Sequence, residues 1–405
     1  MKIKILTLGC KLNFAESSAI MHQLITEGHT KAKAGEQADI VIVNTCTVTD
    51  TADHKDRQAI HRLRRENPTA KIIMTGCYAA LLKQKQERNE QLSCADTNIL
   101  DEIDILKPKD LVNFVNAYSR DDRTRCFLKV QDGCNYFCTY CTIPFARGCS
   151  RNPYIIDIVA QAEQALADGA KEIILTGVNI GDFGHSTGET FLDLLKSLDN
   201  LLPLTYRIRI SSCEPNLLSD EIIDFVAQSK HFAPHFHIPL QSGSNEVLKI
   251  MHRRYTRELF AERVAHIKAV MPNAFIGVDC MVGVRGETEE CWNDYLNFIV
   301  QLPVSQLHVF TYSERANTRM LDMDLYVVPQ AERERRSKIL HKISDDKLAA
   351  FYSANKGQTA TVLWESKKVT NGQSALMFGF TENYIKVSCP YDKSKINTFE
   401  TITVQ

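Results

Sequence analysis

The sequence predicts an α/β protein in three parts: an N-terminal doubly wound domain with a parallel sheet, a central partial (βα)6 barrel and a small C-terminal all-β barrel. Along most of the chain, short apolar runs rich in β-branched residues alternate with helical patterns, which is typical of parallel sheets. Near the C-terminus, strand signals follow one another with no helix between them, which favours a small β-barrel. We place the three parts at residues 1–118, 119–352 and 353–405.

The first part contains three strand candidates, Lys2–Gly9, Ala38–Thr45 and Lys71–Gly76. Helical stretches such as Ser17–Glu27 and His54–Glu66 lie between them. Ligands of a parallel sheet gather at the carboxyl ends of its strands. Each of these three strands ends in a cysteine: Cys10, Cys46 and Cys77.

A polar linker, Ser119–Arg125, leads into the central part. There, strand candidates alternate with helices that bury one face; in 155–166, for example, apolar residues recur at i, i+3, i+4 and i+7. Six βα units predict a partial barrel, because a complete one has eight. The strand candidates are Cys126–Gln131, Glu172–Val178, Arg207–Ser212, His235–Ser242, Phe275–Gly283 and Gln306–Tyr312.

A charged helix over Gln330–Tyr352 closes the central part. The third part then offers short strand candidates alone, the pattern of a small all-β barrel. These candidates are Gln358–Trp364, Ser374–Thr381, Tyr384–Ser388 and Thr398–Val404.

Composition limits the class of protein. Of the 405 residues, 44% are hydrophobic, and 48 basic residues nearly balance 49 acidic ones, so any nucleic-acid binding must come from local patches. The chain shows no secretory leader and no apolar run long enough to cross a membrane. The chain has 13 cysteines, and without those signals they are not expected to form disulfides. We therefore expect a cytoplasmic protein with reduced thiols, and reduced thiols in this number favour metal or cluster binding.

The strongest motif is Cys134-Asn-Tyr-Phe-Cys138-Thr-Tyr-Cys141, just after the first strand of the predicted barrel, where active-site loops belong. Three thiolates hold three irons of a [4Fe–4S] cluster and leave the fourth open. S-adenosylmethionine (SAM) chelates such an open iron, and an electron from the cluster can then cleave it to a 5′-deoxyadenosyl radical. A structural zinc site needs four ligands, and ferredoxins use tighter spacing. The motif therefore predicts a SAM-cleaving cluster on these three catalytic cysteines.

The strand-end cysteines Cys10, Cys46 and Cys77 form a second set. They could be three unrelated buried cysteines, which are common in protein cores. However, they end three consecutive strands, and glycine precedes two of them, which leaves room for a bulky group. These features favour a second cluster held by three cysteines.

Over essentially its whole length the chain resembles the methylthiotransferase family of radical SAM enzymes. Its last part resembles the RNA-binding TRAM module, through Gly379-Phe-Thr-Glu-Asn-Tyr-Ile385. The other matching segments are Leu8–Asn13, Asn44–Thr49, Thr75–Tyr78, Cys134–Cys141, Ala146–Gly148, Leu175–Val178, Ser211–Pro215, Pro239–Ser244 and His308–Arg315.

This resemblance implies two [4Fe–4S] clusters and two uses of SAM. The motif cysteines would hold the cluster that cleaves SAM, and the strand-end cysteines an auxiliary cluster that carries the sulfur. One SAM would methylate that sulfur, and a second would give the radical that takes a hydrogen atom from an unactivated carbon. The C2–H of adenine has no acid–base handle, so the cofactors must carry this step.

Binding of SAM also needs polar groups at the carboxyl ends of the barrel strands. Each candidate could instead be a residue that caps a loop. The candidates are Gly177, Asn179, Ser212, Glu214, Gln241, Ser242, Gly283 and Glu287. The sequence departs from the family at Val284-Arg285, where an aromatic residue and a proline are usual, and at Cys149 and Cys213, so the SAM and substrate pocket is expected to differ in shape. We interpret the remaining cysteines as packing residues: Cys94, Cys126, Cys280, Cys291 and Cys389.

The segment Asn44–Thr49, followed by Ala52, Asp53 and Lys55, is most similar to the branch that acts on N6-threonylcarbamoyladenosine next to the anticodon of tRNA. Other branches act on isopentenyladenosine in tRNA or on an aspartate of a ribosomal protein, and both remain alternatives. A non-catalytic iron–sulfur protein that binds RNA or transfers electrons is an alternative of another class. It would release no 5′-deoxyadenosine from SAM.

The expected partners are a tRNA anticodon stem-loop and a low-potential electron donor of the flavodoxin or ferredoxin type. We expect no membrane contact and a monomer. Basic stretches at His54–Arg65, His252–Arg254 and Arg333–Lys342 would attract phosphates, although each could be a solvated helix face. The aromatic residues Phe378, Phe380 and Tyr384 would either stack on bases or fill the terminal barrel.

Overall fold

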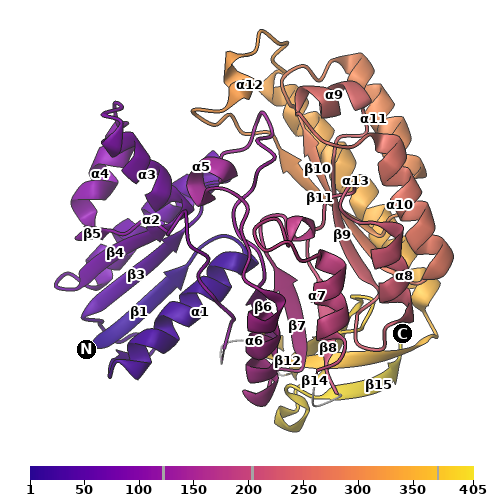
Figure 1. The fold of residues 1–405 in the computed structure, drawn as a ribbon, viewed down its shortest axis with the longest axis horizontal. Helices are drawn as coiled ribbons and strands as arrows, with labels where there is room; N and C mark the ends of the chain where they lie inside the picture. The colour runs from indigo at the N-terminus through magenta and orange to yellow at the C-terminus, as the bar shows by residue number, and fades with distance from the viewer. Residues whose placement is uncertain (121–123, 202–204, 372–373) are drawn as a thin grey trace.

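A computed structural model shows an N-terminal α/β part, a central barrel-like part and a C-terminal sheet (Figure 1). It describes residues 1–120, 124–201, 205–371 and 374–405. The middle of the predicted linker, residues 121–123, lies outside the described residues. None of the helices in these ranges combines the length and the apolar character that crossing a bilayer needs.

The N-terminal sheet is parallel and has the order β2-β1-β3-β4-β5. Its strands are β1 (Lys2–Thr7), β2 (Thr30–Lys31), β3 (Ile40–Thr45), β4 (Lys71–Gly76) and β5 (Ile105–Leu106). The three predicted strands are confirmed, and two short edge strands are added. The chain runs from β1 out to β2 and then returns past β1 to β3, so the strand order reverses between β1 and β3. Such a switch point is where open α/β sheets bind ligands.

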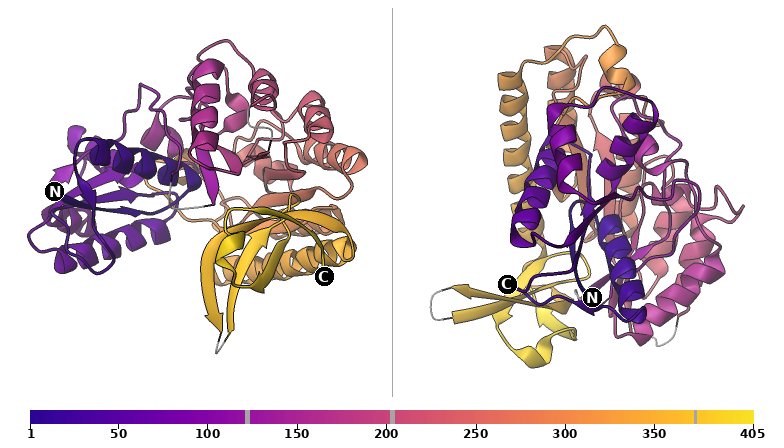
Figure 2. Two further views of the ribbon diagram at one scale, coloured as in Figure 1. Left: turned by 90° about the horizontal axis from the view of Figure 1, so that it is seen from below. Right: turned by 90° about the vertical axis from the view of Figure 1, so that its left-hand side faces the viewer.

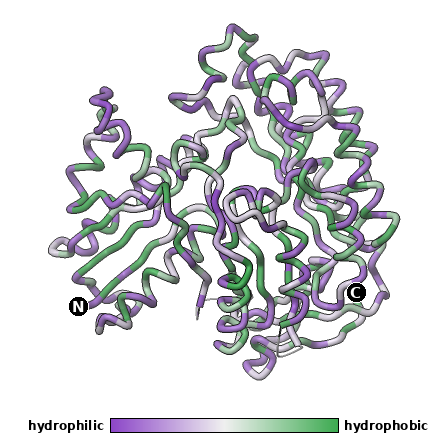
Figure 3. The backbone as a smooth tube through the Cα atoms, viewed as in Figure 1, coloured by the Kyte–Doolittle hydropathy of each residue, from purple (hydrophilic) through white to green (hydrophobic). Residues whose placement is uncertain are grey.

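Four helices connect these strands: α1 (Lys11–Thr26), α2 (Asp50–Glu66), α3 (Cys77–Glu87) and α4 (Cys94–Glu102). The two predicted helices are confirmed but start earlier than expected. α2 starts early because the Thr49 hydroxyl accepts a hydrogen bond from the Ala52 amide at 3.1 Å, an N-cap. Apolar residues of β3 and β4 such as Val43 and Met74 form the core of this part, and the strands stand out as the apolar stretches in Figure 3.

The central part contains all six predicted strands, with slightly different ends. They are β6 (Arg125–Lys129), β7 (Glu172–Thr176), β8 (Arg207–Ile210), β9 (His235–Gln241), β10 (Phe275–Val282) and β11 (Gln306–Thr311). They form two parallel sheets, β6-β7-β8 and β11-β10-β9, and two isolated bridges, Ile208–Phe232 and Ser212–His237, join the segments of β8 and β9. The partial barrel is therefore hydrogen-bonded continuously within each half and only by isolated bridges between the halves.

Helices cover the outside of the central strands (Figure 1). The longer ones are α6 (Ile155–Ala167), α7 (Phe191–Leu198), α8 (Asp220–Gln228), α10 (Arg257–Val270), α11 (Glu289–Gln301) and α13 (Gln330–Asn355). The short ones are α5 (Ile143–Arg147), η1 (Ile180–Asp182), α9 (Asn245–Ile250) and α12 (Arg319–Asp322).

Successive residues of the central strands meet two different environments, as the alternation of a strand requires. Ile208, Ile238 and Val278 belong to the main hydrophobic core shared with the covering helices. Their neighbours Arg209 and Asp279 point the other way, into the barrel. The inner faces of β8 and β10 therefore carry charged residues, whereas Phe127 of β6 and Ile174 of β7 pack in a separate apolar cluster with Ala15 of α1.

The C-terminal part is a four-stranded antiparallel sheet of order β14-β13-β12-β15, with a short turn η2 (Lys393–Lys395). Its strands are β12 (Thr359–Asn371), β13 (Ser374–Phe380), β14 (Lys386–Pro390) and β15 (Phe399–Thr403). The four predicted strands are confirmed, but a closed barrel is not what the described residues form. β12 is long and irregular between Trp364 and Lys368, so it pairs with β15 along its first half and with β13 mainly along its second. β14 and β15 remain as the two edges.

This sheet docks at the end of the barrel where the strands begin, away from the loops that carry the motif cysteines (Figure 2). Arg207 and Arg209 of β8 donate hydrogen bonds to carbonyl oxygens of the sheet, including Thr361 at 3.1 Å and Glu382 at 3.0 Å. Tyr384 packs here at 4.8 Å from both the His235 and Phe380 rings. Two of the three aromatic residues considered for base stacking thus fill this junction.

Candidate active site

The structure brings the strand-end cysteines together at the switch point of the N-terminal sheet. Cys46 directly follows β3 and Cys77 directly follows β4, and the last residues of these strands, Thr45 and Gly76, are paired. Cys10 caps the start of α1, which follows β1. The thiols of Cys77 and Cys10 both act electrostatically on Cys46, so the three side chains share one site.

The backbone of Gly9 lies so close to the side chain of Cys46 that only glycine fits at this position. Its φ is +98°, a left-handed conformation that L side chains avoid. A Cβ at Gly9 would also lie only 3.0 Å from the Cys46 Sγ. Any larger residue would therefore push on the cysteine thiol, which explains why a Gly-Cys pair stands here.

The chemistry of this site fits an iron–sulfur cluster. Cys10 and Cys77 stand at the N-termini of α1 and α3, where the helix dipoles favour negative charge. Burial, with the Cys77 and Cys10 thiols beside it, raises the pKa of Cys46 to about 12. A thiol with such a pKa is neutral unless a cation binds, and bound metal deprotonates it outright.

The motif cysteines lie on the loop between β6 and α5. The loop is held by a hydrogen bond from the Cys134 amide to the Gly148 carbonyl, 3.0 Å, and Phe137 at its centre adopts a φ of +50°. Non-glycine residues with a positive φ are uncommon, and they cluster at functional sites. Burial raises the pKa of Cys134 to about 11 and that of Cys141 to about 12, with the neighbouring Cys138 thiol adding to both. These three side chains therefore also form one site.

Arg253 supplies a buried positive charge to the motif site. Its guanidinium donates to the Cys138 Sγ at 3.1 Å and forms an ion pair with Glu214. Burial raises the pKa of Glu214, while Arg253 acts in the opposite direction. The prediction that His252–Arg254 forms a surface patch for RNA is therefore wrong for Arg253. Sequence reasoning missed this role because the contact joins residues 115 positions apart.

Six of the predicted SAM-binding residues lie at the carboxyl ends of β7, β8 and β9. They are Gly177, Asn179, Ser212, Glu214, Gln241 and Ser242. Asn179 is buried, and its carboxamide has no hydrogen bond of standard geometry to any described residue. Gln241 has a φ of +63°. Buried polar groups whose hydrogen-bonding capacity is not fully used, and residues with positive φ, are both features of ligand sites.

Ser242 and the two candidates that follow β10 make contacts that stabilise the fold. Ser242 is fully buried, and its hydroxyl accepts from the Ser244 amide at 3.2 Å. Glu287 is fully buried and forms an ion pair with Arg336 of α13 at 2.6 Å, while its carboxylate accepts from the Gly283 amide at 3.1 Å. Gly283 and Glu287 follow the carboxyl end of β10 and lie beside arginines of α13, and their role in binding SAM stays a prediction.

A buried charge network links the two cysteine sites. Arg147, six residues after Cys141, contacts Asp132 at 2.8 Å, Glu16 at 3.2 Å and the Asn13 carboxamide oxygen at 2.7 Å. The cations of this network are Lys109, Lys129, Arg147 and Arg151, and its carboxylates are Glu16 and Asp132. Burial opposes the charge of Arg147, but its neighbours, led by Cys77, raise its pKa well above the usual value. The four cations of the network outnumber its two carboxylates. This excess of positive charge lies beside the strand-end cysteines, where it would balance an anionic cluster.

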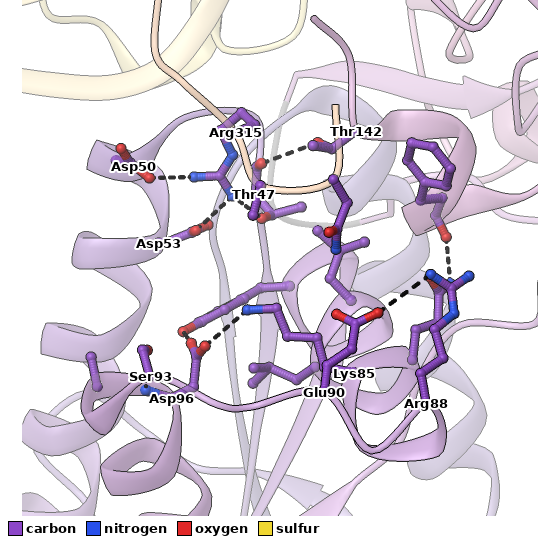
Figure 4. A pocket seen from close by; sticks show the side chains of 18 of the residues that line it. Thr47, Asp50, Asp53, Lys85, Arg88, Glu90, Ser93, Asp96, Thr142 and Arg315 are labelled. Atoms are coloured by element: carbon purple, nitrogen blue, oxygen red, sulfur yellow. Dashed lines mark hydrogen bonds and ion pairs between the residues drawn. The ribbon is translucent and has the colours of Figure 1, made fainter. Parts of the chain in front are cut away.

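A cavity of about 290 Å³ flanks both sites (Figure 4). Its wall includes Thr47, Tyr78 and Thr142, each of which directly follows a cysteine of one of the two sets. Arg315, from the loop after β11, reaches across it to Asp50 and Asp53, both at 2.7 Å. This ion-pair cluster holds the loop after β11 against the N-terminal part.

The other predicted features have mixed outcomes. Arg64 donates to the Glu102 carbonyl oxygen at 2.8 Å and Arg336 is buried, so parts of the basic stretches His54–Arg65 and Arg333–Lys342 stabilise the fold. Of the cysteines interpreted as packing residues, Cys126, Cys280 and Cys291 are buried, whereas Cys94 is exposed and Cys389 half-buried.

Two family models match the chain. Residues 2–95 match a model described as uncharacterized protein family UPF0004, and residues 128–299 match the radical SAM superfamily. The two matches fall on the two cysteine sets, since the first contains the strand-end cysteines and the second the motif cysteines.

Curated relatives cover nearly the whole chain. A threonylcarbamoyladenosine tRNA methylthiotransferase MtaB from Bacillus subtilis is 36% identical over 94% of this chain and 88% of its own. A tRNA-2-methylthio-N(6)-dimethylallyladenosine synthase from Desulfitobacterium hafniense is 30% identical over 100% of this chain and 95% of its own. Among solved structures, the radical S-adenosylmethionine methyltransferase TsrM from Kitasatospora setae has a similar fold, with a TM-score of 0.54, 14% identity, and coverage of 79% of this chain and 73% of its own.

Proposed function

The chain belongs to the radical SAM methylthiotransferase family, and on that premise we propose that it places a methylthio group on C2 of N6-threonylcarbamoyladenosine next to the anticodon of tRNA. SAM serves both as methyl donor and as source of the radical. One observation carries this proposal. The N-terminal part and the barrel pack against each other, and each contributes a set of three cysteines near this contact. Similarity supports the substrate, because the relative named for threonylcarbamoyladenosine is 36% identical and that named for dimethylallyladenosine 30%.

We assign two clusters to the two sets. Cys134, Cys138 and Cys141 would hold the cluster that binds SAM, and Cys10, Cys46 and Cys77 the auxiliary cluster. When bound, these groups supply the electron that cleaves SAM and the sulfur that is transferred. Three ligands per set leave one iron of each cluster for a non-protein ligand, which both roles require.

The protein's own residues contribute charge and position. Arg253 places a fixed cation within hydrogen-bond distance of Cys138, and its ion pair holds the Glu214 carboxylate beside the same cysteine. Arg147 ties the loop after Cys141 to α1, which starts next to Cys10. Because these contacts are buried, water cannot screen them, and they keep the two sites in a constant relation.

We further propose that the RNA partner is an anticodon stem-loop and that a low-potential flavodoxin- or ferredoxin-type protein supplies the electron. An unpaired loop base can be turned into the site at little cost, whereas a paired base would have to be extruded from a duplex.

Mass spectrometry of tRNA nucleosides tests the function directly. Cells that lack the gene should lose 2-methylthio-N6-threonylcarbamoyladenosine and accumulate its precursor without the methylthio group. The wild-type gene should restore the product, and Cys141→Ala should not. Loss of methylthio-isopentenyladenosine instead would move the substrate to that branch, and an unchanged profile would refute tRNA as the substrate.

A further inference from the structure

Three side chains inside the barrel form a group that the cluster assignment does not use. His237 of β9, Asp279 of β10 and His308 of β11 lie on three neighbouring strands. Asp279 pairs with His308 in the strand register, and His237 is paired two residues before Asp279, at Gly277. All three side chains are on the inner face, opposite to the core residues Ile238, Val278 and Leu307.

The distances within this group match those of a metal site. The His237 Nε2 lies 2.7 Å from the Asp279 Oδ1, the His308 Nδ1 lies 3.2 Å from the same His237 nitrogen, and the His308 Nδ1 lies 3.4 Å from the Asp279 Oδ1. In a tetrahedral zinc site with bonds of about 2.0–2.1 Å, ligand atoms stand about 3.3 Å apart. Two of the three separations already have that value, and a small movement along the His237–Asp279 hydrogen bond would give the third.

The electrostatic setting also calls for a cation. Among the described residues, the ion pairs and side-chain hydrogen bonds of Asp279 are with the two imidazoles, and no lysine or arginine pairs with it. Glu214, a second carboxylate, is close enough for Asp279 to act on its charge. Burial opposes the negative charge of Asp279, yet hydrogen bonds from the two histidines lower its pKa, so the carboxylate is ionised. A half-buried, ionised carboxylate that no lysine or arginine neutralises offers a metal ion the negative charge that such a site needs.

The group is also accessible. The side chains of His237, Asp279 and His308 are 20%, 18% and 38% exposed. Gly277, next to His308, carries no side chain, and a Cβ there would lie 3.4 Å from the His308 ring. An ion could therefore reach the three ligand atoms without unfolding the strands.

From this geometry we propose that His237, Asp279 and His308 bind a divalent transition metal ion, with two nitrogen ligands, one oxygen ligand and an open fourth position. Two histidines and one carboxylate are a ligand set that zinc and iron(II) both accept. The ion would tie β9, β10 and β11 together in the half of the barrel that isolated bridges alone join to the other half.

Zinc is the probe for the test, because its X-ray absorption is separate from that of the cluster iron. Cluster-loaded protein is given one equivalent of Zn²⁺, passed through a desalting column and analysed for metal content and at the zinc K-edge. We expect about one zinc per chain, with nitrogen and oxygen at about 2.0–2.2 Å and no sulfur at about 2.3 Å. Sulfur in the zinc shell, or no retained zinc, would overturn the proposal.

Variants locate the ion. Asp279→Asn keeps the shape of the side chain and His308→Ala removes the most exposed ligand, and each should weaken zinc binding at least about tenfold, since even an outer-shell change costs about 10- to 100-fold. His266→Ala is the matched control, because His266 pairs with Asp224 at 2.8 Å on the surface. Iron content and circular dichroism confirm folding. Equal zinc binding in wild type and the two ligand variants, or equal loss in the control, would contradict the site.

Discussion

Replacing Arg147 by glutamine tests whether the buried charge network holds the N-terminal part against the barrel. The guanidinium is 2% exposed and contacts Asp132, Glu16 and Asn13. Removing one member of a buried ion pair typically costs about 3–5 kcal/mol. Lys129 and Arg151 would still pair with Asp132, so we expect the lower end of that range, about 3 kcal/mol.

The assay is urea unfolding of the anaerobic, cluster-loaded protein, read as the free energy of its first cooperative transition. The matched control is Arg62→Gln, since Arg62 makes an exposed i,i+4 pair with Glu66 at 3.7 Å, which is worth about 0–1 kcal/mol. Losing a positive charge beside the strand-end cysteines should also move the midpoint potential of their cluster to a more negative value. If Arg147→Gln and Arg62→Gln unfold at the same urea concentration, the network does not hold the two parts together.

Three further predictions concern single residues. Cys46→Ala and Cys141→Ala should each lower the iron content from about eight to about four atoms per chain, but only the latter should abolish 5′-deoxyadenosine release; complete loss of iron in either would argue against two separate clusters. Arg253→Gln should slow 5′-deoxyadenosine formation at unchanged iron content, and an unchanged rate would remove its role at the motif site. Burial opposes the charge of Glu172, but the two arginines of β8 lower the pKa of its carboxyl group to about 2. The ionised carboxylate therefore stabilises the folded protein by on the order of 3 kcal/mol. This stabilisation is complete above pH 4.5 and is lost as the pH falls towards 2. Acid unfolding should therefore be less pH-dependent in Glu172→Gln, and identical acid profiles would contradict this.

The cysteine sites were predictable because they depend on short-range rules. A parallel sheet brings the carboxyl ends of neighbouring strands together, so Cys46 and Cys77 could be placed side by side from their positions after two strands. The CxxxCxxC spacing likewise needs only one loop. The glycine before Cys10 could likewise be interpreted as leaving room for a bulky group, because it is the neighbour of a strand-end cysteine. The short distance from the Cβ position of Gly9 to the Cys46 thiol agrees with that interpretation.

The charged residues around these sites were not predictable, because their partners are far away in the sequence. Arg253 looked like part of a basic surface patch, and only packing brings it to Cys138. Glu287 is predicted as a SAM-binding residue after a strand, and nothing in the sequence indicated that α13 brings Arg336 to it from 49 residues further along the chain. In both cases the residue type indicated a charge, and the tertiary structure decided which group would balance it.

One long-range feature did leave a pattern in the sequence. The stretches Arg207-Ile-Arg-Ile and His235-Phe-His-Ile alternate strictly, which in a strand means one apolar and one polar face. Strands of a parallel sheet covered on both faces are usually apolar throughout. The alternation therefore already indicated that the inner face of this barrel is not a packed core. A partly polar interior lets the barrel place the Glu214 carboxylate beside the motif cysteines, while the outer faces supply most of the hydrophobic core that holds the strands in place.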